Sequence, residues 1–286
     1  MNEHHERRAV GQVKEVTSLA NPLVKDIKAL ALKKFRDQQH AFMAEGLKLV
    51  IDALDLGWKI HTLVFAKAGR GNPAVEKVAA RTVAAGGTVL EVSEKVLSAI
   101  TRRDNPQMVV GVFAQQFVAL KDIHPRPGDV WVALDRVRDP GNLGTVIRTV
   151  DAVGARGVIL VGDTTDPFSV ETVRATMGSV FAVPVARATP EAFLAWRKGF
   201  AGLVAGTHLK GAVDYRSVDF SKGPTLLLMG NEQQGLPDLL AESCDKLLRI
   251  PQAGRADSLN LAVATAVMLF EIRRDALKLD PEGAQP

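Results

Sequence analysis

The chain has 286 residues, 47% of them hydrophobic and 24% charged, with a formal net charge of +4. Such a length accommodates two ordinary domains, and the composition is typical of a soluble globular protein. The single cysteine, Cys244, excludes a disulfide framework, and we expect it to be a small buried hydrophobe rather than a nucleophile. No run of about 18 apolar residues predicts a membrane span, and the polar stretch MNEHHERRAV resembles neither a signal nor a transit peptide. We therefore expect a cytoplasmic protein with no membrane association.

Positive charge is concentrated in the first part of the chain. Residues 1–124 hold 18 Lys and Arg against 13 Asp and Glu, whereas residues 125–286 hold 18 against 19. This asymmetry suggests a polyanionic partner that contacts mainly the first part. A basic run fits either a solvated helix face or a contact with an RNA backbone; its members are Lys25, Lys28, Lys33, Lys34 and Arg36. For His4 and His5 a frayed tail is favoured over a metal site.

The first part of the chain alternates between helical and strand patterns. Leu47, Val50, Ile51 and Leu54 have the i, i+3, i+4, i+7 spacing of an amphipathic helix. We predict helices over 23–35, 46–56, 74–85 and 94–100, and strands over 60–65, 88–92 and 108–113. These elements predict a compact α/β domain over 14–118, after a flexible tail at 1–13.

A bridge with two prolines and a glycine follows at residues 121–128, and we assign the linker to 119–128. The second domain is expected over 129–279, with a flexible tail at 280–286. We predict strands over 130–134, 157–161, 181–185, 202–206, 225–230 and 246–250, and helices over 143–153, 170–177, 190–198, 236–243 and 258–277. Continuous apolar strands such as 225–229 predict a parallel sheet buried on both faces, with ligands beyond the carboxyl ends of its strands.

Several common chemistries lack their sequence signals. No GxGxxG follows the first strand of either half, and neither GxxxxGK[ST] nor GxSxG is present. No Cys/His cluster has metal-ligand spacing. Hydride transfer, nucleotide hydrolysis, acyl-enzyme chemistry and zinc chemistry are therefore disfavoured, and we predict no metal.

Three loops at predicted strand ends carry polar side chains. In DRVRDPGNLGTVIR, Arg148 is either a solvated helix residue or a guanidinium aimed at a phosphate or hydroxyl. In LMGNEQQG, Gly230 follows a buried strand directly, and Glu232 is either an ordinary first-turn residue or a functional one. In IPQAGRADSLN, Asp257 or Ser258 caps the last predicted helix. Capping then leaves Asn260 without an explanation, because asparagine is a poor helix-interior residue.

The order and spacing of these loops are specific. DPGNLGTVIRT, LLLMGNEQQGL and IPQAGRADSLNLAVATAV resemble the three signature motifs of the SpoU (TrmH) family of RNA 2′-O-ribose methyltransferases, over residues 130–275. More loosely, residues 14–114 resemble the L30e-like substrate-binding domain of the members that act on ribosomal RNA. LANPLVK, FMAEG and NPQMVVG carry this second resemblance.

The resemblance implies a SPOUT α/β fold with a deep C-terminal trefoil knot, S-adenosyl-L-methionine as methyl donor and an obligate homodimer with composite active sites. Matched by motif position, Gly230, Ile250 and Leu259 contact the cofactor, and Thr207 forms a wall of its pocket. Five polar residues surround the ribose: Asn142, Arg148, Glu232, Ser258 and Asn260. The chain differs from the commoner family motifs at Gln252, Ala262 and 173–179. None of these differences removes one of the five polar residues.

The implied chemistry suits these side chains. Methyl transfer is an in-line displacement that needs mainly alignment, and a ribose 2′-hydroxyl also needs activation. Because arginine stays protonated, we expect Arg148 to orient the hydroxyl and the neighbouring phosphate and to stabilise developing alkoxide. Asn142, Ser258 and Asn260 would position the ribose and Arg148, and Glu232 would orient one of them. Methylation of a 2′-hydroxyl requires RNA.

Three alternatives stay open. The first domain favours large-subunit (23S) ribosomal RNA as substrate over transfer RNA, because the tRNA guanosine members of the family usually lack that domain. A catalytically inactive RNA-binding assembly factor is a second alternative, although it has no need of the intact polar set. Base methylation by a related knotted fold is the third, and it would not require Asn142 and Arg148.

Overall fold

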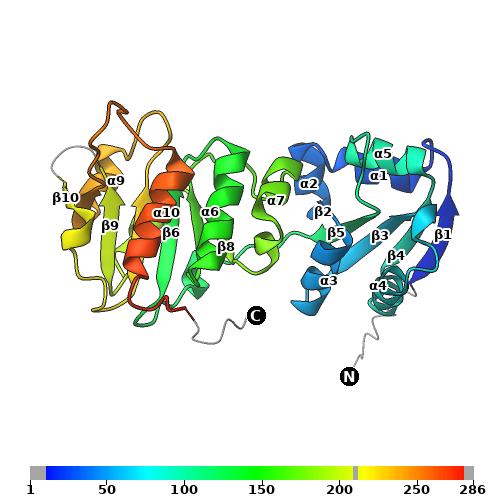
Figure 1. Cartoon of the computed structure of the whole chain (residues 1–286), viewed down its shortest axis with the longest axis horizontal. Coiled ribbons are helices and arrows are strands. Elements are labelled where there is room, and N and C mark those ends of the chain that lie inside the picture. Colours follow the sequence, from blue (N-terminus) through cyan, green and yellow to red (C-terminus); the bar gives the residue numbers. More distant parts are fainter. Residues whose placement is uncertain (1–10, 209–211, 280–286) are drawn as a thin grey trace, which may run out of the picture. The chain divides into compact units, whose positions relative to one another are not determined.

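The structure, a computed structural model, describes residues 11–208 and 212–279. The chain forms two compact units (Figure 1). Unit 1 contains the described residues up to Gln115 together with Phe168–Phe181, and unit 2 contains Gln116–Pro167 and the described residues from Ala182 onward. His4, His5 and the predicted tail at 280–286 lie outside the described residues.

Unit 1 is built on a five-stranded mixed sheet with the order β1-β4-β3-β5-β2. β1 (Gln12–Val16), β4 (Thr88–Val92) and β3 (Ile60–Ala66) pair in parallel. β5 (Val109–Ala114) is antiparallel both to β3 and to β2 (Ala41–Glu45). Five helices belong to the first stretch of the unit: α1 (Pro22–Ala29), α2 (Lys33–Gln39), α3 (Leu47–Asp55), α4 (Pro73–Ala84) and α5 (Glu94–Thr101). A 3₁₀ turn, η1 (Lys67–Gly69), follows β3.

Alternate side chains of these strands enter two cores, as the two-residue repeat of a strand requires. Ala41 and Met43 pack with α1 and α5 on one face, and Phe42 and Ala44 pack with α3 and α4 on the other. The second core also contains a segment from the middle of the predicted second domain, α7 (Val170–Thr176) and η3 (Ser179–Phe181). The second domain was expected over 129–279, whereas residues 168–181 are part of unit 1.

Aromatic contacts fix this segment in unit 1. The Phe168 ring lies 4.5 Å from that of Phe42, centroid to centroid, and Trp58 Nε1 donates to the Phe181 carbonyl at 2.8 Å. Arg174 donates from Nε and Nη2 to the Glu45 carboxylate at 3.0 and 2.8 Å. The chain therefore passes between the two units at three points rather than at the predicted linker alone.

Unit 2 contains a seven-stranded sheet with the order β10-β12-β9-β11-β6-β7-β8, and every pair in it is parallel. The strands are β6 (Val130–Asp135), β7 (Gly157–Val161), β8 (Val185–Ala188), β9 (Leu203–Thr207), β10 (Val213–Asp214), β11 (Thr225–Met229) and β12 (Lys246–Arg249). β6, β7 and β11 are buried throughout, which confirms the interpretation of the apolar runs as doubly covered parallel strands.

Helices cover both faces of this sheet. α6 (Pro140–Ala152) and α10 (Leu261–Ile272) pack together in one core, and Figure 1 shows them side by side. α8 (Pro190–Arg197) and α9 (Asp238–Glu242) contribute to the opposite core. The 3₁₀ turn η4 (Tyr215–Ser217) follows β10, and η2 (Leu120–Asp122) lies in the bridge. The bridge packs on unit 2, because Val118 pairs with the edge strand β8 and Ile123 is buried.

Several predicted boundaries were wrong. The single helix over 23–35 is two helices, α1 and α2, and β1, β2 and β10 were not predicted. β1 includes residues 12–13 of the predicted tail. Residues 179–181 form η3, so the strand predicted to begin at 181 begins at Val185.

Arg36 does not fit either interpretation of the basic run. Its side chain is buried, and its Nη1 donates to the Leu30 carbonyl at 2.8 Å, at the break between α1 and α2. A buried arginine needs such partners to offset its lost hydration. Arg36 is therefore a structural residue.

Candidate active site

The carboxyl ends of the parallel strands bring the three motif loops to one edge of the unit 2 sheet. β6 ends at Asp135, β11 ends at Met229 beside it, and β9 and β12 follow in the sheet order. Asp139 caps α6 by accepting from the Asn142 amide at 2.6 Å, and Pro140 occupies the first turn. This pairing of cap and proline sets the start of α6 and the position of Asn142.

Glu232 joins the second loop to the first. Its carboxylate accepts long hydrogen bonds from the backbone amides of Arg138 and Asp139, at 3.3–3.4 Å. It also accepts from Nδ2 of Asn142 at 3.3 Å. The geometry therefore gives Glu232 an orienting contact with Asn142, one of the candidate ribose ligands.

Asn260 joins the third loop to the first. Its Nδ2 donates to Oδ1 of Asn142 at 2.9 Å, and its own Oδ1 accepts from the Ala262 and Val263 amides. Asn260 is thus the N-cap of α10, which begins at Leu261 rather than at the predicted residue 258. The predicted capping by Asp257 or Ser258 was wrong, and Asn260 is not a helix-interior residue.

Two of the predicted ribose residues stand outside this network. Arg148 lies on the exposed side of α6, and Ser258 lies in the exposed loop before α10. Neither forms a hydrogen bond or an ion pair with the residues that the structure describes. A guanidinium with five unused donors is available to a substrate without breaking an existing contact.

Three of the four predicted cofactor residues lie at the carboxyl ends of these strands. Thr207 ends β9, Gly230 follows β11 and Ile250 follows β12, while Leu259 is 37% exposed just before α10. A Cβ on Gly230 would come within 2.1 Å of the Gly235 and Leu236 backbone. Residue 230 must therefore be a glycine because the backbone of Gly235 and Leu236 packs against it, and not only because a ligand approaches there.

These loops offer the kind of surface that a cofactor with an apolar and hydrogen-bonding periphery needs. All residues from Pro251 to Asn260 are exposed, and residues 251–259 form no backbone hydrogen bonds with the described residues. Free backbone groups beside Ile250 and Leu259 fit a nucleoside that is recognised through main-chain donors and acceptors.

The sequence interpretation missed an inner set of residues that supports this edge. Asp135 is buried, and burial raises the pKa of its carboxyl, while the hydrogen bond from Arg136 Nε, at 2.9 Å, acts in the opposite direction. Arg136 has a left-handed backbone with φ of 46°, and its Nη1 donates to Gln234 at 3.0 Å. Asn231 Nδ2 donates to the Arg136 carbonyl at 2.8 Å. Only the Asn231 turn had a sequence signal, because asparagine favours such turns.

No helix in the described part of the chain is long and apolar enough to cross a membrane. Among the same residues, no group of three or more His, Cys, Asp or Glu side chains is arranged to hold a metal ion.

The fold is that of a two-unit α/β protein whose polar site lies at the carboxyl ends of the parallel strands of unit 2. Similarity to known sequences identifies its family. Residues 129–270 match the SpoU rRNA Methylase family, and residues 21–111 match the MRM3-like substrate binding domain. A 23S rRNA (guanosine(2553)-2′-O)-methyltransferase, RlmP from Bacillus subtilis, is 33% identical over 91% of this chain and 100% of its own length. The chain belongs to the SpoU rRNA methylase family.

Solved structures agree in fold and extent. The AdoMet-bound rRNA methyltransferase from Sinorhizobium meliloti is 67% identical, with a TM-score of 0.89 over 93% of this chain and 99% of that chain. The SpoU methyltransferase AviRb from Streptomyces viridochromogenes, in complex with AdoMet, is 30% identical, with a TM-score of 0.80 over 90% of this chain and 98% of that chain. Both similarities span the two units.

Proposed function

We propose that this chain transfers a methyl group from S-adenosyl-L-methionine to a ribose 2′-hydroxyl of large-subunit (23S) ribosomal RNA. The observation that carries the proposal is the hydrogen-bonded chain Asn260–Asn142–Glu232, which unites all three family motifs at one sheet edge. RlmP is named as a 23S rRNA methyltransferase and the Sinorhizobium meliloti protein as an rRNA methyltransferase, and both match the two units.

S-adenosyl-L-methionine supplies the methyl group on a positively charged sulfur, an electrophile that needs no metal. Gly230, Ile250 and Leu259 would hold it through main-chain groups and apolar surface, with Thr207 as a further wall. Arg148 would bind the phosphate beside the target ribose and stabilise negative charge on the 2′-oxygen as its proton leaves for solvent. Asn142 and Ser258 would hold the ribose. Glu232 and Asn260 act on Asn142 and are positioning residues.

The active protein would be a homodimer. α10 is apolar except at Thr265 and Glu271, and its Val263 and Phe270, seven residues apart on one face, are 50% and 53% exposed. A second copy covering this face would bury surface that is otherwise costly to leave in water. It would also bring a partner surface to the exposed loop that holds Ser258. The C-terminal trefoil knot and the cytoplasmic location stay predictions.

Incubation of the protein with labelled cofactor and deproteinised total RNA tests the reaction. The labelled RNA is digested to nucleosides, and 2′-O-methylnucleosides are separated from base-methylated ones. We expect label in the ribose of a large-subunit RNA nucleotide. Label confined to bases, or to tRNA, would contradict the proposal, and no label with any RNA would favour a non-catalytic RNA-binding factor.

A further inference from the structure

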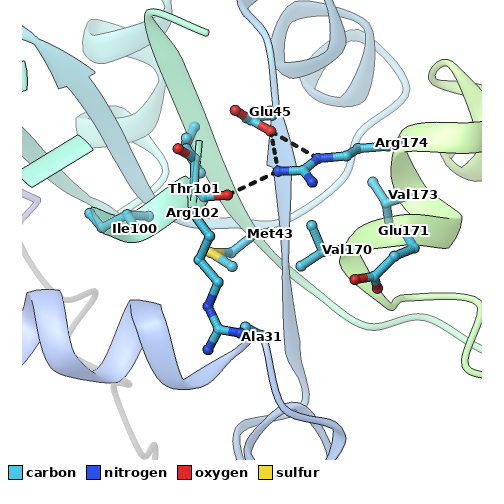
Figure 2. Close-up of a pocket in the computed structure, with 11 residues that line it drawn as sticks. Ala31, Met43, Glu45, Ile100, Thr101, Arg102, Val170, Glu171, Val173 and Arg174 are labelled. Carbon is cyan, nitrogen blue, oxygen red and sulfur yellow. Dashed lines mark hydrogen bonds and ion pairs between the residues drawn. The ribbon is translucent and has the colours of Figure 1, made fainter. Parts of the chain in front are cut away.

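Unit 1 contains a cavity of about 220 Å³ that is separate from the candidate active site. Its lining comes from the α1–α2 connection, β2, the end of α5, β5 and α7 (Figure 2). The walls are mixed: Met43, Ile100, Val110 and Val173 form buried aliphatic parts, and the polar part is formed by Glu45, Thr101, Arg102, Glu171 and Arg174. Pockets for drug-sized ligands usually span about 300–1,000 Å³, so this one suits a single flat ring system rather than a whole nucleotide.

One polar wall of the cavity is rigid. Arg174 is held by the Glu45 carboxylate, and its Nη2 also donates to the Thr101 carbonyl at 3.0 Å. These bonds use Nε and Nη2 and leave Nη1 without a partner among the described residues. Figure 2 shows this remaining nitrogen on the side of Val170. The Arg174 guanidinium is therefore a fixed hydrogen-bond donor with unused capacity.

Two of the charged side chains that line the cavity are exposed. They are Arg102 and Glu171, and Figure 2 shows them on opposite sides of Met43 and Val170. Neither forms an ion pair or a hydrogen bond with the residues that the structure describes. A ligand between them meets an acceptor on one side, a planar cation on the other and the Arg174 donor in the wall.

We propose that this cavity binds one unstacked guanine base of the substrate RNA, as an anchor on a nucleotide other than the methylated one; this proposal rests on the proposed function. The aliphatic part of the lining fits a face of a base, and the polar part fits its edges, as in the recognition of splayed-out bases in single-stranded RNA. Guanine presents N1–H and N2–H donors for the Glu171 carboxylate, and O6 and N7 acceptors for a guanidinium. No other standard base presents two adjacent donors and two such acceptors.

The first test measures binding of overlapping unmodified fragments of large-subunit rRNA to the full chain by fluorescence anisotropy at fixed salt. Glu171→Gln removes the double acceptor, Arg102→Ala removes the cation and Ala31→Phe fills the cavity. Glu76→Gln and Lys77→Ala, exposed on α4, are the matched controls. We expect each cavity variant to raise the Kd for one fragment about tenfold, the scale of losing one good base contact. Thermal unfolding and cofactor binding should match the wild type.

The second test identifies the base. Fragments with scattered inosine, which lacks the N2 amino group, are selected for binding and sequenced. We expect one guanosine at which inosine weakens binding to the wild type but not to Glu171→Gln. Cavity variants that bind like the controls, or inosine effects that are the same in both proteins, would overturn the proposal.

Binding and methyl transfer are scored separately in these experiments. A wild-type chain that binds RNA without methylating it would contradict the proposed function. The RNA affinities of the cavity variants would still test the proposal that the cavity binds a guanine. Methylation with unaltered binding by all three cavity variants would overturn the anchor alone. Failure of the wild type to bind any fragment would contradict both.

Discussion

Asn260 donates from Nδ2 to Oδ1 of Asn142 at 2.9 Å, although the two residues are 118 positions apart. The same amide caps α10 with its oxygen. One side chain therefore caps α10 and, through Asn142, contacts the first turn of α6. Because Asn142 also donates to Glu232, the three motif loops hold one another in place.

Asn260→Asp should separate capping from positioning. Aspartate caps a helix about as well as asparagine, so the free energy of unfolding should change by no more than about 0.5 kcal/mol. A carboxylate cannot donate to Asn142, so the single-turnover rate of methyl transfer should fall at least tenfold. Asn260→Ala, which loses both contacts, should also lose about 0.5–2 kcal/mol in urea unfolding. Full activity of the aspartate variant would show that the Asn142 contact is not needed.

Arg148→Ala should abolish methyl transfer and leave the fold intact. The side chain is exposed and without a partner among the described residues, so stability should stay within about 0.5 kcal/mol of the wild type. Loss of one charge-stabilising donor typically lowers kcat about 10²–10³-fold. Arg148→Lys should restore only part of the rate, because an ammonium lacks the planar fork. Arg126→Ala, in the exposed bridge, is the matched control and should retain activity.

Phe168→Ala should destabilise unit 1, although residue 168 follows the second strand of the methyltransferase region. The ring is 1% exposed and packs on Phe42 and Trp58, so its loss should cost about 3–5 kcal/mol. Trp58 fluorescence in a Trp131→Phe/Trp196→Phe background would report urea unfolding of unit 1. Phe193→Ala, in the core of unit 2, is the control and should leave the Trp58 transition unchanged. An unshifted midpoint for Phe168→Ala would mean that residues 168–181 contribute little to the stability of unit 1.

Cys244 should react slowly with iodoacetamide in the folded protein. It is half-buried, and burial raises the pKa of its thiol from 9.0 to about 12, against the opposing charge of Arg197. Near pH 8 the folded thiolate population should therefore fall roughly a thousandfold below that of the unfolded chain. Because the unfolded thiol ionises first, its contribution to stability is present below pH 9.0 and is lost as pH rises toward 12. Mass spectrometry in native buffer and in urea measures this; equal rates would contradict a protonated, protected thiol.

Local sequence patterns predicted most of the parallel strands of unit 2, because each is a short, continuous apolar run. They failed where long-range contacts decide the structure. β1 was missed because four of its five residues are exposed and charged or polar residues interrupt it. The helix over 23–35 was predicted as continuous because nothing in its periodicity shows that Arg36 turns back to the Leu30 carbonyl.

Only part of the candidate site was predicted, because local patterns do not show which distant residues contact one another. Motif order identified Asn142, Glu232 and Asn260, which the structure joins by hydrogen bonds. Arg136 was missed because its partners, such as Gln234, lie about a hundred positions away, and Asp135 was missed with it because its carboxylate accepts from Arg136. Phe168 and Phe181 indicate burial, but no local pattern shows that their core is the one built around Phe42.

A ribose-methylation map of large-subunit rRNA tests the central claim most directly. RNA from a strain that lacks this protein would be compared at single-nucleotide resolution with RNA from the same strain carrying the wild-type or the Arg148→Ala protein. We predict one 2′-O-methyl mark that is absent without the protein, restored by the wild type and not by Arg148→Ala. An unchanged map, or a mark restored equally by both proteins, would contradict the assignment of the reaction to this site.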